Sequence, residues 1–364
     1  MEDYSLPIVI DNGSGMIKAG FAGDREPEST FPSVIWKIPS KGIKIGMGGK
    51  ETWIGKEIRP NIPLEMTSPF KKGIIENMND MERIWFHLLY NELKVAPEEH
   101  AILMSDNCWN PPEIREKISQ IMFEDLNILS LNISDQSALS LIASLKSTGV
   151  VFGSGEQITS AVPVFEGHPI PDSVSLIDFS GKQITEHLIG LLNLSDTPEK
   201  RLLAREIKEK LCYVSLDFEE EMKKEIEMLF ELPDGQKITI GNERFRAVEP
   251  LFNFSKFTNQ KSIQNSIFDS IWKIDGDLSN NLFSNIILSG GSTLFLGMKE
   301  RIEKELKETV KELPLQFKVD CSHNKNLAWY GGSLLFSTSS FRRDIVTRDQ
   351  YDENGPSIVH NFFF

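Results

Sequence analysis

The sequence is poor in cysteine, in long apolar runs and in positive charge. Its 364 residues contain three cysteines, Cys108, Cys212 and Cys321, which are odd in number and far apart. That pattern is typical of neither a disulfide framework nor a zinc cluster, so a reducing compartment is expected. No apolar run approaches the roughly 20 residues that cross a bilayer. The first ten residues, MEDYSLPIVI, are acidic and lack the apolar core of a signal peptide.

The charge balance argues against two classes of partner. Basic residues number 39 against 53 acidic ones, which gives a formal net charge of -14. A surface of that sign repels nucleic-acid backbones and anionic membranes, so we expect neither nucleic-acid binding nor membrane insertion. The hydrophobic share of 40% and the length favour a soluble globular chain with two or more lobes.

Two glycine-rich segments resemble each other. The first is IVIDNGSGMIKAG, residues 8–20, and the second is VVFGSGEQITSAV, residues 150–162. Each has a short β-branched or apolar run, a glycine turn and a returning strand. When they are aligned, the acidic Asp11 of the first copy faces Gly153 of the second. The repeat predicts an internal duplication, in which the two turns occupy equivalent places.

Other segments carry clear helix and hairpin signals. Apolar residues at helical spacing predict helices over residues 79–93, 111–125 and 197–216, the first of them capped by Asn79. Residues 231–246 predict a hairpin around Asp234 and Gly235. Residues 284–310 predict a strand, a Gly290-Gly291 turn and a helix, and residues 327–341 predict a second strand–GG–helix unit. This alternation predicts an α/β class with two duplicated lobes, whose glycine turns point into a shared cleft.

The glycine turns favour a nucleotide ligand. Backbone N–H groups approach a phosphate closely where side chains are absent, and Lys18 could reach the same phosphate as a point charge. Asp11 could hold Mg²⁺ through water. Neither GxxxxGK[ST] nor GxGxxG is present. A lone DNGSG is usually only a turn, Arg205 and Glu209 could be an ordinary surface pair, and Gly290 could mark a bulge or a close packing point. The duplication favours the nucleotide interpretation.

Longer blocks resemble the conventional actin family. They are DNGSGMIKAGFAGD, YNELKVAPEEH, REIKEKLCYVSLDFE, ELPDGQKITIGNERFR and QYDENGPSIVH, and the resemblance runs from Ile8 to His360. It implies an actin-like α/β fold of duplicated ribonuclease-H-like lobes, with two large domains, four subdomains and a central nucleotide cleft. The implied boundaries are 1–32, 69–142 and 327–364 for subdomain 1, 33–68 for subdomain 2, 143–177 and 262–326 for subdomain 3, and 178–261 for subdomain 4.

The resemblance also implies ATP or ADP with Mg²⁺ (or Ca²⁺) as ligands, and it assigns residues to them. Asp11 matches the cation-side acid, acting through water, and Gln136 matches the glutamine that positions the attacking water. The implied nucleotide-binding residues are Asn12, Gly13, Ser14, Gly15, Met16, Lys18, Ser154, Gly155, Gly181, Arg205, Lys208, Glu209, Gly290, Gly291, Leu294, Phe295 and Lys325. Leu294 and Phe295 replace the family's usual methionine and tyrosine.

The second turn departs from the family pattern. Gly153 replaces the aspartate that faces the cation and the lytic water, and Ser160 replaces a histidine that helps to order that water. Glu156 keeps a carboxylate one bond longer, so it is a doubtful catalytic substitute. Gln157 replaces a glycine and is expected to cost about 1 kcal/mol if it keeps a glycine-like backbone. Because a positioned acid–base group contributes about 10²–10⁴-fold in rate, any actin-type ATPase activity should be slow.

Departures elsewhere bear on assembly. The apolar plug segment of the family aligns with FTNQKS, residues 257–262, which is polar here. Lys72 replaces a histidine, the loop region 40–50 gains Lys44, and the tail ends in NFFF. The leading interpretation is a divergent cytoskeletal protein of the cytoplasm that assembles into or with actin filaments and binds actin-binding proteins at the cleft between subdomains 1 and 3. The alternative is a non-polymerising, actin-related scaffold subunit. Sugar kinases and heat-shock ATPases of the same broad fold fit these blocks less well.

Overall fold

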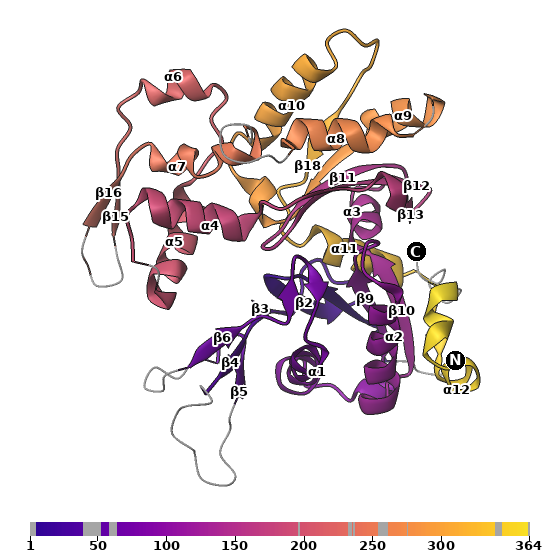
Figure 1. Cartoon of the computed structure of the whole chain (residues 1–364). Helices are drawn as coiled ribbons and strands as arrows, with labels where there is room; N and C mark the ends of the chain where they lie inside the picture. Colours follow the sequence, from indigo (N-terminus) through magenta and orange to yellow (C-terminus); the bar gives the residue numbers. More distant parts are fainter. Residues whose placement is uncertain are drawn as a thin grey trace. The chain divides into compact units, whose positions relative to one another are not determined.

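The computed structural model describes residues 5–38, 52–57, 64–195, 197–231, 235, 237–253, 261–274, 276–338 and 344–362. The chain divides into two compact units. The first unit comprises Met1–Ser147, Phe165–Pro169 and Asn326–Phe364, and the second comprises Thr148–Val164 and Ile170–Lys325. Helices and strands alternate in both units (Figure 1).

The first unit is built on a six-stranded mixed sheet with the order β19-β10-β9-β1-β2-β3. Its central strand β1 pairs antiparallel with β2 and parallel with β9, and β9 pairs parallel with β10. The strand bounds are β1 Ile8–Asn12, β2 Met16–Phe21, β3 Ser29–Pro32, β9 Ala101–Asp106, β10 Ser130–Asp135 and β19 Val346–Thr347.

The second unit repeats this arrangement. Its central strand β11 pairs antiparallel with β12 and parallel with β17, and β17 pairs parallel with β18. The bounds are β11 Gly149–Ser154, β12 Thr159–Phe165, β14 Ser175–Ile177, β17 Ile286–Ser289 and β18 Val319–Cys321. The order β3-β2-β1-β9-β10 of the first unit thus recurs as β14-β12-β11-β17-β18, because β14 pairs antiparallel with β12 as β3 does with β2. This repeated topology confirms the predicted duplication.

Alternation along the strands of the first unit places side chains on both faces of its sheet. Ile8 and Ile10 of β1 join one buried cluster, and Val9 joins another. Helix α1 (Met78–Phe86) packs into the first cluster, whereas α3 (Gln136–Ala143) and α11 (Leu327–Phe336) belong to the second. The remaining helices of this unit are α2 (Pro112–Gln120) and α12 (Arg348–Asn354), and α1 and α2 continue as the π-helical turns His87–Glu92 and Ile121–Asp125.

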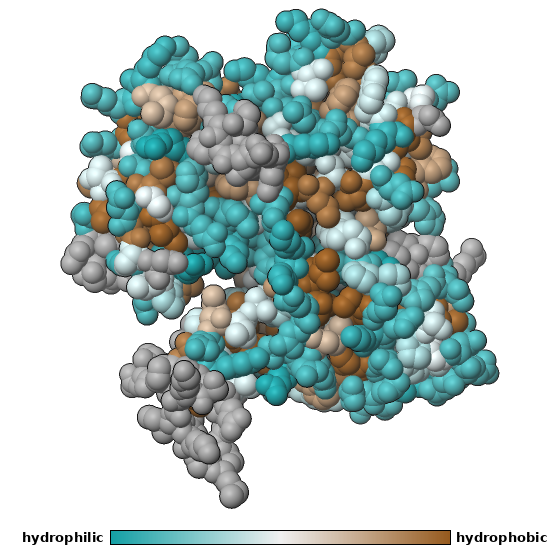
Figure 2. Space-filling model, viewed as in Figure 1, coloured by the Kyte–Doolittle hydropathy of each residue, from teal (hydrophilic) through white to brown (hydrophobic). Residues whose placement is uncertain are grey.

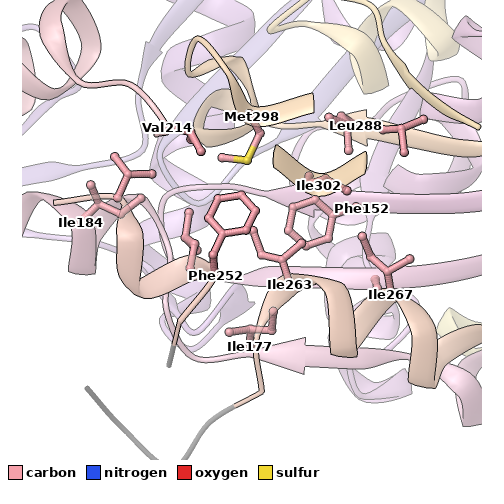
Figure 3. Close-up of a cluster of buried hydrophobic side chains, with 14 of the residues drawn as sticks. Phe152, Ile177, Ile184, Val214, Phe252, Ile263, Ile267, Leu288, Met298 and Ile302 are labelled. Carbon is pink, nitrogen blue, oxygen red and sulfur yellow. The ribbon is translucent and has the colours of Figure 1, made fainter. Parts of the chain in front are cut away.

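The core of the second unit forms between its sheet and its helices. Figure 3 shows Phe152 of β11 close to Ile302 of α10 (Met298–Thr309) and Ile267 of α8 (Ile263–Trp272), and all three side chains are at most 1% exposed. The apolar stripe of α10, formed by Met298, Ile302 and Leu306, is therefore buried, and the helix predicted within residues 284–310 is present. The other helices of this unit are α4 Gly181–Leu191, α5 Pro198–Leu211, α6 Phe218–Met222, α7 Glu243–Arg246 and α9 Gly276–Phe283.

Smaller sheets complete the fold. The predicted hairpin in residues 231–246 is present as β15 and β16, which pair antiparallel, although Asp234 lies outside the described residues. The bounds of the remaining strands are β4 Ile35–Lys37, β5 Thr52–Ile54, β6 Glu65–Thr67, β7 Phe70–Lys71, β8 Ile74–Ile75, β13 His168–Pro169, β15 Met228–Glu231 and β16 Lys237–Ile240.

Two local predictions are wrong. Residues 327–336 form the single helix α11 and contain no strand, because Gly331 lets α11 approach α3 closely. A Cβ atom at Gly331 would lie 1.8 Å from the carbonyl oxygen of Leu139. The N-cap of α1 is Asn77, whose side chain accepts from the backbone N–H of Asp80 at 3.1 Å. Asn79, the predicted cap, is already inside the first turn.

Several predictions concern residues that the structure does not describe. The loop region 40–50, with Lys44, and residues 257–260 of the plug segment lie outside the described residues. The division into four subdomains remains a prediction. Within the described ranges, no helix has the length and apolar character needed to cross a membrane. Polar residues cover much of the face drawn in Figure 2.

Candidate functional site

The turn between β1 and β2 is fixed by its own backbone and by the residue that follows β3. A Cβ atom at Gly13 would lie 2.5 Å from the carbonyl oxygen of Met16, so this position requires glycine. Ser33 holds the turn from outside, since its hydroxyl donates to the carbonyl of Gly13 at 2.5 Å and its N–H donates to the carbonyl of Gly15 at 3.2 Å. Among the described residues, no acceptor takes the backbone N–H of Ser14 or of Gly15.

Asp11 is the buried acid next to this turn. It is 4% exposed and lies opposite Lys18 in the β1–β2 register. The Lys18 ammonium is 2.9 Å from Asp11 Oδ2, and the Ser105 hydroxyl donates to Asp11 Oδ1 at 2.9 Å. The aspartate is therefore paired on both oxygens, which offsets the cost of burying a polar group.

Gln136 reaches the same carboxylate from helix α3. It is the first residue of that helix, and its Nε2 lies 3.2 Å from Asp11 Oδ1 and 3.2 Å from Ser105 Oγ. Asp135 caps the helix by accepting from the N–H groups of Ser137 and Ala138 at 2.8 and 3.1 Å. Burial raises the pKa of Asp135 to about 6, against the hydrogen bonds that stabilise its charge.

The turn between β11 and β12 has the same backbone register with different side chains. Gly153 lies opposite Ser160, as Asp11 lies opposite Lys18. The turn closes on itself, because the N–H of Gly155 donates to the carbonyl of Ile158 at 3.0 Å. Gln157 is not among the residues with positive φ, so the strain predicted there is absent.

The second turn is tied to the start of α4. The N–H groups of Gly181 and Lys182 donate to the carbonyls of Gly155 and Glu156 at 2.9 and 2.8 Å. The hydroxyl of Ser180, the N-cap residue, donates to the carbonyl of Glu156 at 2.6 Å. Two backbone N–H groups and one hydroxyl at the start of α4 thus hold the second turn, as Ser33 holds the first.

Gly290 supports the second turn from the end of β17. Its φ is 89°, and a Cβ atom there would lie 2.4 Å from the carbonyl oxygen of Ser154. Gly290 is therefore a close packing point, one of the two alternatives left open by the sequence. Gly291 begins a short 3₁₀ turn that ends at Leu294, and Phe295 follows it, partly buried against the core.

Lys208 on α5 joins this group, while Arg205 and Glu209 lie beside it on the same helix. Lys208 is 4% exposed, its ammonium donates to the carbonyl of Gly181 at 2.7 Å, and Glu156 Oε2 is 4.0 Å away. Burial lowers the pKa of Lys208. Arg205 Nε and Glu209 Oε1 form an i,i+4 pair at 2.9 Å. Lys325 is the last residue of the second unit.

A family model described as Actin matches residues 2–364, essentially the whole chain. The protein belongs to the actin family. It is therefore an actin-like nucleotide-binding protein, and the first turn fits the ligands of that family. The N–H groups of Ser14 and Gly15 and the Lys18 ammonium, all within one strand–turn–strand segment, suit phosphate oxygens. The carboxylate of Asp11 suits the water shell of Mg²⁺.

Sequence reasoning missed three residues of this actin-like site. Ser105 links Asp11 to Gln136, Asp135 caps the helix of Gln136, and Ser180 holds the second turn. A signal for Ser105 was present, because a polar residue follows the buried run AILM at the carboxyl end of a strand. Ligand sites of α/β sheets gather at such ends.

Proposed function

We propose that the chain binds ATP or ADP together with Mg²⁺ (or Ca²⁺). The supporting observation is the first turn, where unused backbone N–H groups, an ammonium and a buried carboxylate lie within a few residues. Ser14, Gly15 and Lys18 would bind phosphate oxygens, with Asn12, Gly13 and Met16 shaping the turn. Asp11 would hold the cation through water, and Gln136 would orient the attacking water. The cation supplies charge neutralisation of the phosphates when it is bound.

The residues of the second unit would bind the rest of the nucleotide. Ser154 and Gly155 would bind phosphate oxygens from the second turn. Gly181, Lys208 and Gly290 already contact that turn or its supporting helix. The proposed ribose and base residues are Arg205, Glu209, Gly291, Leu294, Phe295 and Lys325.

Hydrolysis is proposed to be slow. In the family an aspartate stands at the position of Gly153 and a histidine at the position of Ser160, and this chain offers neither an acid nor an imidazole there. Glu156 is the nearest carboxylate in the turn, but its carboxylate lies 4.0 Å from the Lys208 ammonium.

Assembly into or with actin filaments in the cytoplasmic cytoskeleton, together with actin-binding proteins, is the proposed cellular role. The alternative is a non-polymerising scaffold subunit, which the polar sequence FTNQKS favours. Sedimentation in the presence of salt and Mg²⁺ separates the two. A pellet that depends on ATP supports the filament role, and a persistent monomer supports the scaffold role.

Nucleotide binding is tested by calorimetry with Mg·ATP on the purified full chain. We expect saturable binding that Lys18→Met weakens. Lys311→Met is the matched control, because Lys311 is an exposed lysine paired with Glu308 in the second unit. Absence of heat and of any shift in melting temperature with the wild-type chain would refute the proposal. Phosphate release at saturating ATP then tests the slow hydrolysis, and a rate equal to that of a conventional actin measured in parallel would overturn it.

A further inference from the structure

Ser105 lies where three elements of the first unit meet. It is 1% exposed, near the carboxyl end of β9, the strand between β1 and β10. The parallel register aligns Met104 with Ile10 of β1 and Ser105 with Ser134 of β10. One neighbouring strand therefore delivers Asp11, and the other leads directly into Gln136. The Ser105 side chain hydrogen-bonds to both Asp11 and Gln136.

The hydroxyl of Ser105 is fully used. A serine hydroxyl has one proton to donate and two lone pairs that accept. Ser105 Oγ donates to Asp11 Oδ1 at 2.9 Å, accepts from the N–H of Asn12 at 3.0 Å, and accepts from Gln136 Nε2 at 3.2 Å. Because all three directions are committed inside a buried site, the hydroxyl has no freedom to rotate without losing a bond.

This arrangement fixes which end of the Gln136 amide faces inward. The groups around its inner end are all acceptors, namely Asp11 Oδ1 at 3.2 Å, Ser105 Oγ at 3.2 Å and the carbonyl of Asn12 at 3.4 Å. The Ser105 proton is already given to Asp11, so only the NH₂ group of Gln136 satisfies them. A flipped amide would place its carbonyl oxygen against three acceptors, so Oε1 is directed away from them.

We infer that Ser105 is a positioning residue, which holds the Gln136 amide so that Oε1 accepts the O–H of the attacking water. Gln136 takes no proton in this role and only orients the water. The inference rests on the proposed nucleotide function for its effect on hydrolysis. The amide orientation itself does not depend on that function, because it follows from contacts within the first unit.

The first experiment therefore needs no nucleotide. The side-chain ¹⁵N–¹H signals of Gln136, identified by their loss in Gln136→Leu, are recorded in the full-length protein. Ser105→Ala is expected to shift these signals and to speed their exchange with water, and Ser105→Thr, which keeps the hydroxyl, is expected to restore both. Ser270→Ala is the control, because Ser270 is also buried and donates to a backbone carbonyl at 2.8 Å in the second unit. Unchanged Gln136 signals in Ser105→Ala would overturn the inference.

The second experiment separates positioning from binding. We expect Ser105→Ala to slow single-turnover phosphate release roughly 10-fold, to change the Kd for Mg·ATP less than about 3-fold, and to have no further effect in a Gln136→Ala background. An equal slowing in both backgrounds would overturn the inference. If Mg·ATP fails to bind to the wild type, the proposed function falls, but the nucleotide-free result on Ser105 stands.

Discussion

The two glycine turns have the same position in two sheets of the same core topology, yet only the first has an ion pair between the strands that flank it. In the first unit Asp11 and Lys18 are cross-strand partners 2.9 Å apart, and in the second Gly153 and Ser160 occupy that pair of positions. The pairing of the central strand with its two neighbours is the same in both units. The backbone hydrogen bonds between the two strands form with Asp11 and Lys18 in one unit and with Gly153 and Ser160 in the other. The strand topology therefore does not depend on the residues that give the first turn its charge.

Different contacts explain why the second turn keeps its shape without an ion pair. Its carbonyls are bound by N–H groups of Gly181 and Lys182, and Gly290 packs directly on Ser154. These are backbone contacts, which depend little on side-chain identity, and the Ser180 hydroxyl adds one side-chain contact to the carbonyl of Glu156. The first turn relies more on side chains, since Ser33 and Ser105 fix it from outside. A loss of side chains should therefore be more harmful in the first turn.

The largest expected difference between the two turns is in how much a substitution changes the free energy of unfolding. Asp11→Ala removes a buried carboxylate that takes both the Lys18 ammonium and the Ser105 hydroxyl, and we expect a loss of about 3 kcal/mol in the free energy of unfolding. Gly153→Ala is the matched change in the second unit. A Cβ atom there lies 3.5 Å from Ser160 Oγ, an ordinary contact, so it should cost nothing or stabilise by up to about 1 kcal/mol. Urea unfolding without nucleotide measures both, and equal losses would contradict the asymmetry.

The next effect is on hydrolysis. Gly153→Asp adds the missing acid at a site with room for its Cβ atom, and Ser160→His adds the imidazole. We expect the double variant to release phosphate about 100-fold faster than the wild type, the lower end of the effect of a positioned acid–base group. Gly153→Asn with Ser160→His is the control of equal shape without the charge. If the asparagine variant is as fast as the aspartate variant, the missing acid is not the cause of slow hydrolysis.

A smaller effect tests how the second turn is held. Gly290→Ala must accept a φ of 89° and a contact of 2.4 Å with the carbonyl of Ser154, and we expect a loss of about 2 kcal/mol. Gly190→Ala is the control in the same unit, because Gly190 lies near the end of helix α4 with nothing within 4 Å of its Cβ position. That variant should gain up to about 1 kcal/mol. Thermal unfolding of the two variants would refute the packing role of Gly290 if both gained stability.

Local sequence patterns predicted most of the strands and helices. The runs IVI and VVF ended by glycine predicted the central strands, and the apolar spacing of residues 79–93 and 284–310 predicted helices whose stripes are buried. The Gly331-Gly332 pair was misinterpreted as a turn because the same dipeptide at 290–291 is one. What differs is the neighbour: a Cβ atom at Gly331 would strike the backbone of α3, a contact that the local sequence does not contain.

Site residues could be predicted where they match a family motif. They could not be predicted where only the pairing of distant strands brings them together. Asp11, Lys18 and Gln136 follow from the resemblance, and they do lie within hydrogen-bond distance of one another or of a shared partner. Ser105 is separated from Asp11 by 94 positions, and only the parallel pairing of β1 with β9 brings the two together. Sequence reasoning that stops at motifs will miss such supporting residues.

The smallest expected effect is a pH dependence of the unfolding free energy. It should involve α3, which carries Gln136, and not α4, which supports the second turn. The cap of α3 is ionisable, because Asp135 is buried and its pKa is raised to about 6 from the ordinary 3.8, whereas the cap of α4, Ser180, does not titrate. Between those two values the folded state holds a proton at Asp135 that the unfolded state has lost. The contribution of Asp135 is therefore most favourable below pH 3.8 and is lost as the pH rises through 6.

The difference in unfolding free energy between the wild type and Asp135→Asn isolates this group, since other titrations are shared. We expect that difference to move against the wild type by about 1 kcal/mol between pH 4.5 and 5.5, close to the 1.4 kcal/mol that one full proton contributes per pH unit. Ser180→Ala, compared with the wild type in the same way, should give a difference that does not change with pH. A flat profile for Asp135→Asn would mean that Asp135 is ionised in the folded state throughout, held by the N–H groups of Ser137, Ala138 and Cys108. The helix that carries Gln136 would then be as insensitive to acid as its counterpart in the second unit.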